Sequence, residues 1–305
     1  MLGCSTDERA TAIPPRAPDE LAISGTAVVM IGAGDIAVCG TRGDEETGKL
    51  VDSIIVADSI AGIETAVFTL GDNAYPSGSS GVDNDFPRCF SPSWGSKRIM
   101  NVIHTAPGNH DYDSGSGTPY FGYFGTRAGP PGKGYYSYDF GGWHLISLNS
   151  ELYFGAGTQA DVTAQEEWLR HDLADHPSLC TIAYWHRPLY SSGTYGPTPQ
   201  VQRLWRILYD GGTDLILNGH EHDYERFLPQ TADGAVDSVK GITQIVAGTG
   251  GGVLRKMTPP FERNSVFQIH GRFGVLKLTL GAGEYRHAFI DVHGRVWDAG
   301  AGKCH

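Results

Sequence analysis

The chain has 305 residues, of which 40% are hydrophobic and 19% are charged, so it is long enough to bury a substantial core. Its formal net charge of −11 argues against broad electrostatic binding to nucleic acid or to an anionic membrane surface. No apolar stretch has the length of a membrane span, so no transmembrane helix is predicted. An anionic substrate would therefore need a local positive centre, which bound metal ions can supply.

The N-terminal segment differs in composition from the rest. Residues 1–25 are rich in proline and are predicted to form a flexible tail, and residues 26–305 are predicted to form a single domain. The tail contains Leu2-Gly3-Cys4, as at the end of a bacterial lipoprotein signal, but no apolar segment precedes it. We interpret Cys4 as an incidental residue of the tail; a leader that was removed or misassigned is the alternative.

From residue 27 onward, apolar runs of strand length alternate with helical patterns, which indicates an α/β fold. The strands predicted in this part are residues 27–34, 65–70, 101–106, 143–149, 180–185 and 214–218.

Three helices are predicted between these strands. The first contains residues 50–57 and ends near Gly62. The second begins with the capping-box pair Thr163 and Glu166. The third covers residues 201–208, where apolar residues recur at i, i+3, i+4 and i+7.

The last part of the chain changes character. Residues 242–250, 273–280, 284–292 and 294–298 are predicted to be successive strands with little helix between them, which implies a meander. Earlier, residues 112–136 are rich in Gly, Pro, Tyr and Ser without periodicity, and a loop of that length is often a binding loop.

The five cysteines include no CxxC pair, so neither a thiolate zinc site nor a thioredoxin-like site is indicated. Cys39 and Cys89 lie in loop-like segments and either pair in an oxidising compartment or stay reduced; the sequence does not separate the two. Cys180 opens an apolar strand and is predicted to be a buried thiol.

Residues of metal-binding type lie at the ends of five predicted strands, where α/β sheets gather their ligands. In chain order they are Asp35, Asp72 with Tyr75, Asn109 with His110, His186, and His220 with His222. Each alone is a weak signal, because a Gly-Asp after a strand is usually a turn or a helix cap and a lone His is more often structural. Together they offer carboxylate, amide, phenol and imidazole groups, a mixture that suits transition metals rather than calcium.

The ordered set GD, GDxxY, GNHD, strand-His and GHxH, from Asp35 to His222, resembles the calcineurin-like metallophosphoesterases. The Tyr of the second motif makes it similar to the purple acid phosphatases and their small bacterial relatives. The resemblance implies a four-layer α/β/β/α sandwich, in which two mixed sheets are flanked by helices and the metal centre lies at the strand ends.

The resemblance also implies two metal ions. The implied ligands of the first ion are Asp35, Asp72, Tyr75 and His222, and those of the second are Asp72, Asn109, His186 and His220. Asp72 would bridge the ions. Many superfamily members carry D-x-H or D-x-G in the first motif, whereas this chain has Asp35-Ile36-Ala37.

The first motif therefore lacks the His ligand of D-x-H members, and Tyr75 can replace it as a phenolate. A phenolate favours Fe(III) at the first site, with Fe(II), Zn or Mn at the second. The alternative is that Tyr75 is a core aromatic residue beside the site.

The implied reaction is hydrolysis of phosphate monoesters through attack of a metal-bound hydroxide. His110 is the candidate general acid, because histidine titrates nearest neutral pH. Asp111 is a candidate to orient His110, although adjacent residues often point apart. Asn109, His110 and Arg226 are the residues expected to contact substrate, unless Arg226 only pairs with Glu225.

Other residues near the motifs carry less information. Arg187 flanks a motif without an assigned role. The candidates for the rim of the site are Tyr120, Tyr123, Tyr190 and Tyr195, and the sequence assigns none of them to it.

Two other functions stay open. A phosphodiesterase would use the same centre, because specificity lies in loops such as 112–136 and 188–200. The other is a binding module that keeps the fold and the metals but does not turn over substrate.

The expected partner is a small phosphate ester, with no nucleic acid as a stable partner. The resemblance and the Cys39/Cys89 pair suggest an extracytoplasmic protein, whether periplasmic, secreted or lipid-anchored.

Overall fold

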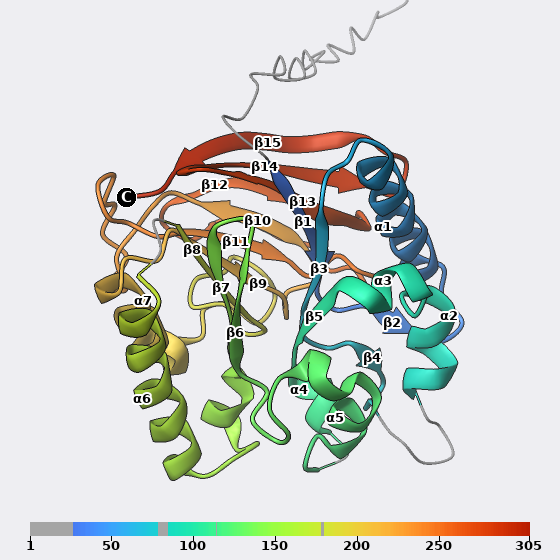
Figure 1. The fold of residues 1–305 in the computed structure, drawn as a ribbon, viewed down its shortest axis with the longest axis horizontal. Coiled ribbons are helices and arrows are strands. Elements are labelled where there is room, and N and C mark those ends of the chain that lie inside the picture. The colour runs from blue at the N-terminus through green and yellow to red at the C-terminus, as the bar shows by residue number, and fades with distance from the viewer. Residues whose placement is uncertain (1–26, 79–84, 114, 178–179) are drawn as a thin grey trace, which may run out of the picture.

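Two mixed β-sheets pack face to face in the computed structural model (Figure 1), which describes residues 27–78, 85–113, 115–177 and 180–305. Helices cover the outer sides of the two sheets, so the predicted four-layer α/β/β/α sandwich is confirmed. The predicted tail, residues 1–25 with Cys4, lies outside the described residues.

The first sheet has six strands in the order β15-β14-β13-β1-β3-β5. Their bounds are β1 Val28–Ala33, β3 Thr65–Leu70, β5 Ile103–Ala106, β13 Gly274–Gly281, β14 Glu284–Asp291 and β15 Val296–Lys303. Strands β1, β3 and β5 are parallel neighbours, so the turns that follow them lie at the same edge of the sheet. Strands β13 to β15 form an antiparallel meander.

The second sheet has seven strands in the order β12-β10-β11-β9-β8-β7-β6. Their bounds are β6 Tyr136–Phe140, β7 Trp143–Ser147, β8 Thr181–Trp185, β9 Leu215–Asn218, β10 Tyr224–Phe227, β11 Thr243–Ala247 and β12 Ser265–Ile269. Strands β7, β8, β9 and β11 are parallel. A separate pair joins β2 (Ala37–Val38) to β4 (Ala74–Tyr75).

The helices divide between the two outer sides (Figure 1). The first sheet is covered by α1 Gly43–Ile60, α2 Ser91–Ser93, α3 Lys97–Val102, α5 Thr118–Phe124 and the π-helix η1 Phe86–Phe90. The second is covered by α6 Gln159–Asp175 and α7 Gln202–Asp210. Short turns are α4 Asn109–Tyr112 and the 3-10 helices η2 Gly125–Ala128, η3 Ser150–Phe154 and η4 Pro199–Val201.

The core follows from the period-2 alternation of buried strands. In β1, Val28 and Met30 face the second sheet and share one apolar cluster with Leu217 of β9. Val29 and Ile31 point the other way and pack under the helices. Because both faces of β1 are covered, its sequence is apolar throughout, as is typical of a buried parallel strand.

The predicted start of α6 is wrong. The helix begins at Gln159, and its capping box joins Thr158 and Asp161: the Thr158 backbone N–H donates to Asp161 Oδ2 at 2.7 Å. Thr163 lies inside the helix, where its hydroxyl donates to the carbonyl oxygen of Gln159. Two Thr-x-x-acid patterns follow one another here, at residues 158–161 and 163–166, and the earlier one forms the cap.

Residues 112–136 are not a continuous loop. They contain α5 and η2, and Tyr120 and Phe124 of α5 are buried in the cluster beneath the first sheet. Tertiary packing of these rings stabilises a helix too short for a periodic signal. The predicted meander is also shorter than expected, because β11 belongs to the second sheet, where it pairs with β9.

Both cysteine pairs of the described chain are disulfides. Cys39 pairs with Cys89, and Cys180 pairs with Cys304, so the prediction that Cys180 is a free thiol is wrong. The chain end returns to the start of β8, where the carboxylate of Asp214 accepts hydrogen bonds from the backbone N–H groups of Thr181 and His305.

Among the described residues, none of the helices combines the length and the apolar character needed to cross a bilayer.

Candidate metal centre

The centre lies at the strand ends, on turns with unusual backbone geometry. Asp35, Asp72 and His220 have φ values of 59°, 49° and 71°, in the left-handed region that residues other than glycine seldom adopt. Gly219 precedes His220 where a Cβ atom would lie 2.5 Å from the carbonyl oxygen of Leu70. Strained backbone of this kind concentrates at functional sites.

The first group of donor atoms surrounds the phenol of Tyr75. Its Oη lies 3.0 Å from Asp35 Oδ1, 3.2 Å from Asp72 Oδ2 and 3.2 Å from His222 Nε2. Ligand atoms of one ion, each about 2.1 Å from it, are roughly 3.0 to 3.5 Å apart. The four side chains therefore have the spacing of one coordination sphere.

The second group surrounds His186. Its Nε2 lies 3.2 Å from Asn109 Oδ1, 3.3 Å from Asp72 Oδ2 and 3.1 Å from His220 Nδ1. The oxygen Asp72 Oδ2 belongs to both groups, so one carboxylate oxygen lies where two ions would share it. The structure thus brings together all seven predicted ligand residues.

Backbone donors hold the other oxygens of the two aspartates. Asp35 Oδ2 accepts the backbone N–H of His220 at 2.8 Å, and Asp72 Oδ1 accepts that of His110 at 2.8 Å. The remaining oxygens, Asp35 Oδ1 and Asp72 Oδ2, are left to face the centre.

Carbonyl groups orient two of the imidazole rings in the same way. His186 Nδ1 donates to the carbonyl oxygen of Leu70 at 2.8 Å, and His222 Nδ1 donates to that of Val253 at 2.7 Å. With their protons on Nδ1, both rings direct the Nε2 lone pair inward. Outer hydrogen bonds of this type are usual for metal-binding histidines.

The electrostatics of the group fit a cation. Burial and the carboxylates of Asp35 and Asp72 raise the pKa of Tyr75 well above its ordinary value. Burial acts to lower the pKa of His186, but Asp72 raises it to about 10. The cluster therefore retains protons that offset its carboxylates, and a metal ion in their place would provide the same compensation.

His110 lies beside the centre without joining either group of donors. Its Nε2 is 3.9 Å from Asp72 Oδ2, its ring is 4.6 Å from that of Tyr75, and its side chain is 33% exposed. On the other side of the ring, Nδ1 lies 2.5 Å from the carbonyl oxygen of Pro76 and 2.9 Å from Asp113 Oδ2. Asp113 was not predicted, although the i, i+3 spacing on the turn of α4 is a signal that could have identified it.

Asp111 does not contact the ring of His110. Its buried carboxylate accepts hydrogen bonds from the backbone N–H of Gly108 at 2.8 Å and from the backbone and side-chain amides of Asn73 at 3.1 and 2.9 Å. Burial raises the pKa of Asp111 to about 7. Asp111 therefore ties two site turns together instead of orienting the acid.

Arg226 lies away from the centre, whereas Arg187 lies beside it. Arg226 on β10 donates to Asp298 on β15, Nε at 2.7 Å and Nη2 at 3.0 Å, and so links the sheets instead of pairing with Glu225 or reaching the centre. Arg187, without a predicted role, has Nη1 3.2 Å from His220 Nε2. Its position directly after His186 is the sequence signal that could have placed it beside the centre.

Of the four tyrosines considered for the rim, Tyr195 lies at the centre, stacked on the ring of His220 at 4.8 Å. Tyr120 is fully buried under the first sheet. Tyr123 packs on Phe86 of η1, and the edge of Tyr190 meets Trp205 of α7.

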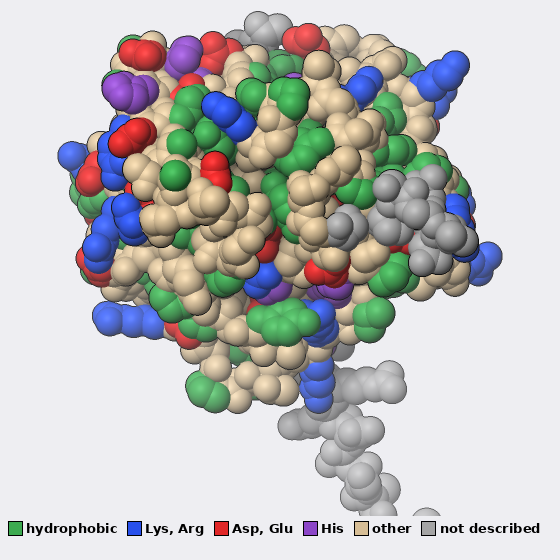
Figure 2. Space-filling model, turned by 90° about the horizontal axis from the view of Figure 1, so that it is seen from below, with side chains coloured by type: hydrophobic (Ala, Val, Ile, Leu, Met, Phe, Trp, Pro, Cys, Tyr) green, Lys and Arg blue, Asp and Glu red, His purple; other side chains and the backbone are tan. Residues whose placement is uncertain are grey.

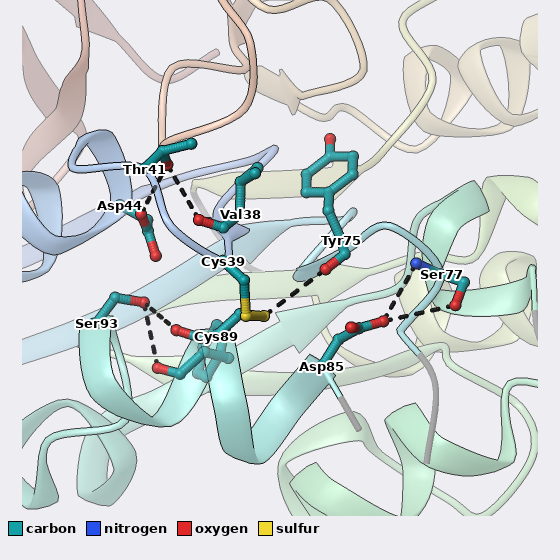
Figure 3. The surroundings of a disulfide bond; sticks show 10 residues. Val38, Cys39, Thr41, Asp44, Tyr75, Ser77, Asp85, Cys89 and Ser93 are labelled. Atoms are coloured by element: carbon teal, nitrogen blue, oxygen red, sulfur yellow. Dashed lines mark hydrogen bonds between the residues drawn. A yellow bond between two sulfur atoms is a disulfide. The ribbon is translucent and has the colours of Figure 1, made fainter. Parts of the chain in front are cut away.

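A disulfide lies next to the backbone of Tyr75 (Figure 3). Cys39 follows β2, in which Val38 pairs with Tyr75 of β4. Its partner Cys89 has Sγ 3.8 Å from the carbonyl oxygen of Tyr75. The phenol therefore projects from a short strand whose pairing partner, β2, is followed by a residue that is covalently linked to η1.

The centre is open to solvent on one side. A cavity of about 380 Å³ adjoins Asn109, His220, Arg187 and Tyr195. Figure 2 views the molecule from the side of these strand ends and shows histidine, acidic and basic side chains close together in the lower half of the face. A small anionic molecule can reach the donor atoms from this side.

Known proteins resemble this chain in sequence and in fold. Human acid phosphatase type 7 is 29% identical over 66% of this chain and 51% of its own length. Purple acid phosphatase 15 of Arabidopsis thaliana is 30% identical over 44% of this chain and 27% of its own length, so the chain spans about half or less of these relatives.

Among solved structures, the purple acid phosphatase PPD1 from yellow lupin has the same fold, with a TM-score of 0.73, 22% identity, and coverage of 92% of this chain and 54% of its own. The family profile of calcineurin-like phosphoesterases matches residues 30–224, which contain every candidate ligand. The chain belongs to the calcineurin-like phosphoesterase family.

Proposed function

We propose that this protein hydrolyses phosphate monoesters at a dinuclear metal centre. The observation that carries the proposal is that one oxygen, Asp72 Oδ2, lies within 3.3 Å of atoms in both groups of donors. The proposed ligands are Asp35, Asp72, Tyr75 and His222 for the first ion, and Asp72, Asn109, His186 and His220 for the second. Two ions bound there would activate water as the nucleophile and neutralise charge on the phosphoryl group.

The proposed metals follow from the donor chemistry. A phenolate is a hard anionic oxygen, so the site of Tyr75 favours Fe(III). The second site offers two imidazoles, an amide and a carboxylate, which suit Fe(II), Zn or Mn. The acid phosphatases and purple acid phosphatases among the relatives support the phosphatase reaction, and the choice of metals rests on the donor chemistry alone.

His110 is the proposed general acid. It lies close to the centre, is exposed enough to meet a substrate, and has its Nδ1 next to Asp113. With the Nδ1 proton held by the carbonyl oxygen of Pro76 and the carboxylate of Asp113, a proton on Nε2 would face the leaving oxygen. Asn109 and His110 are the proposed substrate contacts, and Arg226 leaves this set because Asp298 holds it elsewhere.

An extracytoplasmic location is proposed on the same basis. The two disulfides are compatible with an oxidising compartment and are rare in reducing ones. The proposed partner is a small phosphate ester, with no nucleic acid as a stable partner.

The function is tested by assaying purified protein, with iron and a divalent metal added, on 4-nitrophenyl phosphate and on bis(4-nitrophenyl) phosphate. We expect faster turnover of the monoester and no turnover after chelation of the metals. Faster turnover of the diester would instead make the protein a phosphodiesterase. No turnover of either ester by metal-loaded protein would favour the binding module.

A further inference from the structure

Arg187 is held rigidly beside the second group of ligands. Its Nε donates to both oxygens of Glu151, at 3.0 and 3.1 Å, and its guanidinium lies 4.3 Å over the ring of Phe154. Its backbone N–H donates to Ser150 Oγ at 3.2 Å. These contacts fix the side chain, which is only 18% exposed, before any ligand arrives.

The terminal nitrogens of Arg187 remain directed at the site. Within the described part of the chain, the hydrogen bonds of this guanidinium reach only Glu151 and His220. Arg187 and Phe154 also line both cavities that open beside Asn109, one of about 380 Å³ and one of about 210 Å³. The guanidinium therefore borders the space that a substrate would enter.

The contact between Arg187 and His220 changes character once His220 serves as a ligand. Its Nδ1 faces His186 Nε2 at 3.1 Å and would give its lone pair to the metal, so the proton of the neutral ring lies on Nε2. That N–H and the Nη1 N–H groups of Arg187, whose nitrogens are 3.2 Å apart, are then both donors. Two donors at this distance need a shared acceptor, and an anionic oxygen between them would satisfy both.

Neighbouring residues keep His220 in this orientation. The ring of Tyr195 stacks on the ring of His220. The guanidinium of Arg255 in turn lies 4.2 Å from the centre of the Tyr195 ring. The backbone N–H of Tyr195 donates to Glu221 Oε1 at 2.6 Å. Both donors of the pair are therefore positioned in advance of binding.

We propose that Arg187 binds a terminal phosphoryl oxygen of the substrate and makes the site select phosphate monoesters over diesters. The proposal rests on the proposed phosphatase function and deepens it. A monoester has three terminal oxygens, so that one remains for Arg187 when two others face the ions. A diester has only two terminal oxygens and would leave the guanidinium without its acceptor.

A purely structural role would make Arg187 the counter-ion of buried Glu151 and nothing more. The two roles separate by measuring the affinity of metal-loaded protein for inorganic phosphate, which needs no turnover. The variants are Arg187→Ala and Arg187→Lys, with Arg206→Ala as the control, because Arg206 pairs with Asp233 at the exposed surface. Metal content is determined for each protein.

We expect Arg187→Ala to weaken phosphate binding by about 10- to 100-fold, the usual effect of losing a charge-assisted hydrogen bond, while the two ions are retained. The phosphate affinity of Arg187→Lys should fall between those of Arg187→Ala and the wild type, because lysine keeps the charge but not the fork of donors. Arg206→Ala should bind phosphate like the wild type. In turnover, kcat/KM for the monoester should fall at least tenfold more than kcat/KM for the diester.

Unchanged phosphate affinity in Arg187→Ala would overturn the proposal, as would equal losses for the monoester and the diester. Loss of metal from both Arg187 variants would also overturn it, because the residue would then support the centre itself. If the wild type hydrolyses neither ester, the proposed function fails, and the phosphate affinities still decide whether Arg187 binds the anion.

Discussion

At the scale of single residues, the motifs predicted which side chains meet, but not which surrounding residues hold them in place. The strand-end positions of Asp35, Asp72 and His186 follow from parallel strands ending at one edge. The partner of Arg226 could not be predicted, because Asp298 lies 72 residues away on the facing sheet. Likewise, the contact of Arg187 with His220 depends on how two strand-end turns approach each other.

The role of His110 is tested by His110→Ala. Turnover should fall by roughly 10² to 10⁴, the usual contribution of a positioned general acid, with nearly intact metal content. The loss should be much smaller for an activated aryl ester, whose leaving group hardly needs a proton. Steady-state kinetics and elemental analysis are the measurements.

The control for this experiment is Asn109→Ala, in which we expect loss of metal from the second site. If His110→Ala itself strips metal, the residue is a ligand and the division of roles is wrong.

The role of Tyr75 is tested by Tyr75→Phe. With iron bound and oxidised, the wild type should show a visible phenolate-to-Fe(III) charge-transfer band, because the cation lowers the pKa of a phenol that its surroundings otherwise raise. Phenylalanine keeps the ring but not the oxygen, so the band should vanish and the first site should weaken. A colourless, fully iron-loaded wild type would show that Tyr75 only packs beside the centre.

At the scale of elements, the structure places Tyr75, a proposed metal ligand, next to a disulfide. The short pair of β2 and β4 places Tyr75 next to the Cys39–Cys89 bond, while the Cys180–Cys304 bond joins the start of β8 in the second sheet to the end of β15 in the first. The sequence left the first pair open and missed the second, because pairing depends on a three-dimensional approach of residues 50 and 124 positions apart. Short elements such as α5 were missed because packing, not periodicity, stabilises them.

Replacing the first pair by serine, in Cys39→Ser/Cys89→Ser, should lower the free energy of unfolding by about 2 to 4 kcal/mol and weaken iron binding at the Tyr75 site. Urea denaturation and the visible charge-transfer band measure the two effects.

Cys180→Ser/Cys304→Ser is the matched control, which should lose stability but keep the band. Equal bands in both double variants would mean that the disulfide does not support Tyr75. Titration that finds all five cysteines free in denatured, unreduced protein would remove the argument altogether.

At the scale of the whole molecule, strand-helix alternation predicted an α/β fold, but the four layers came from the family resemblance. Periodicity identifies a buried strand without saying which sheet it joins, so residues 243–247 were placed in the C-terminal meander although they pair with β9. Strands β2, β4, β6, β10 and β12 were not predicted. The site was more predictable than the topology, because its chemistry restricts residue types at each strand end.

The central claim is that two ions share Asp72, and metal content per chain tests it most directly. Elemental analysis of protein loaded with iron and a divalent metal should find close to two ions per chain in the wild type. Asp72→Ala should lose both ions, because its Oδ2 belongs to both groups, whereas His222→Ala should keep the second. A wild type that binds one ion or none, or an Asp72→Ala variant that retains two, would contradict the account.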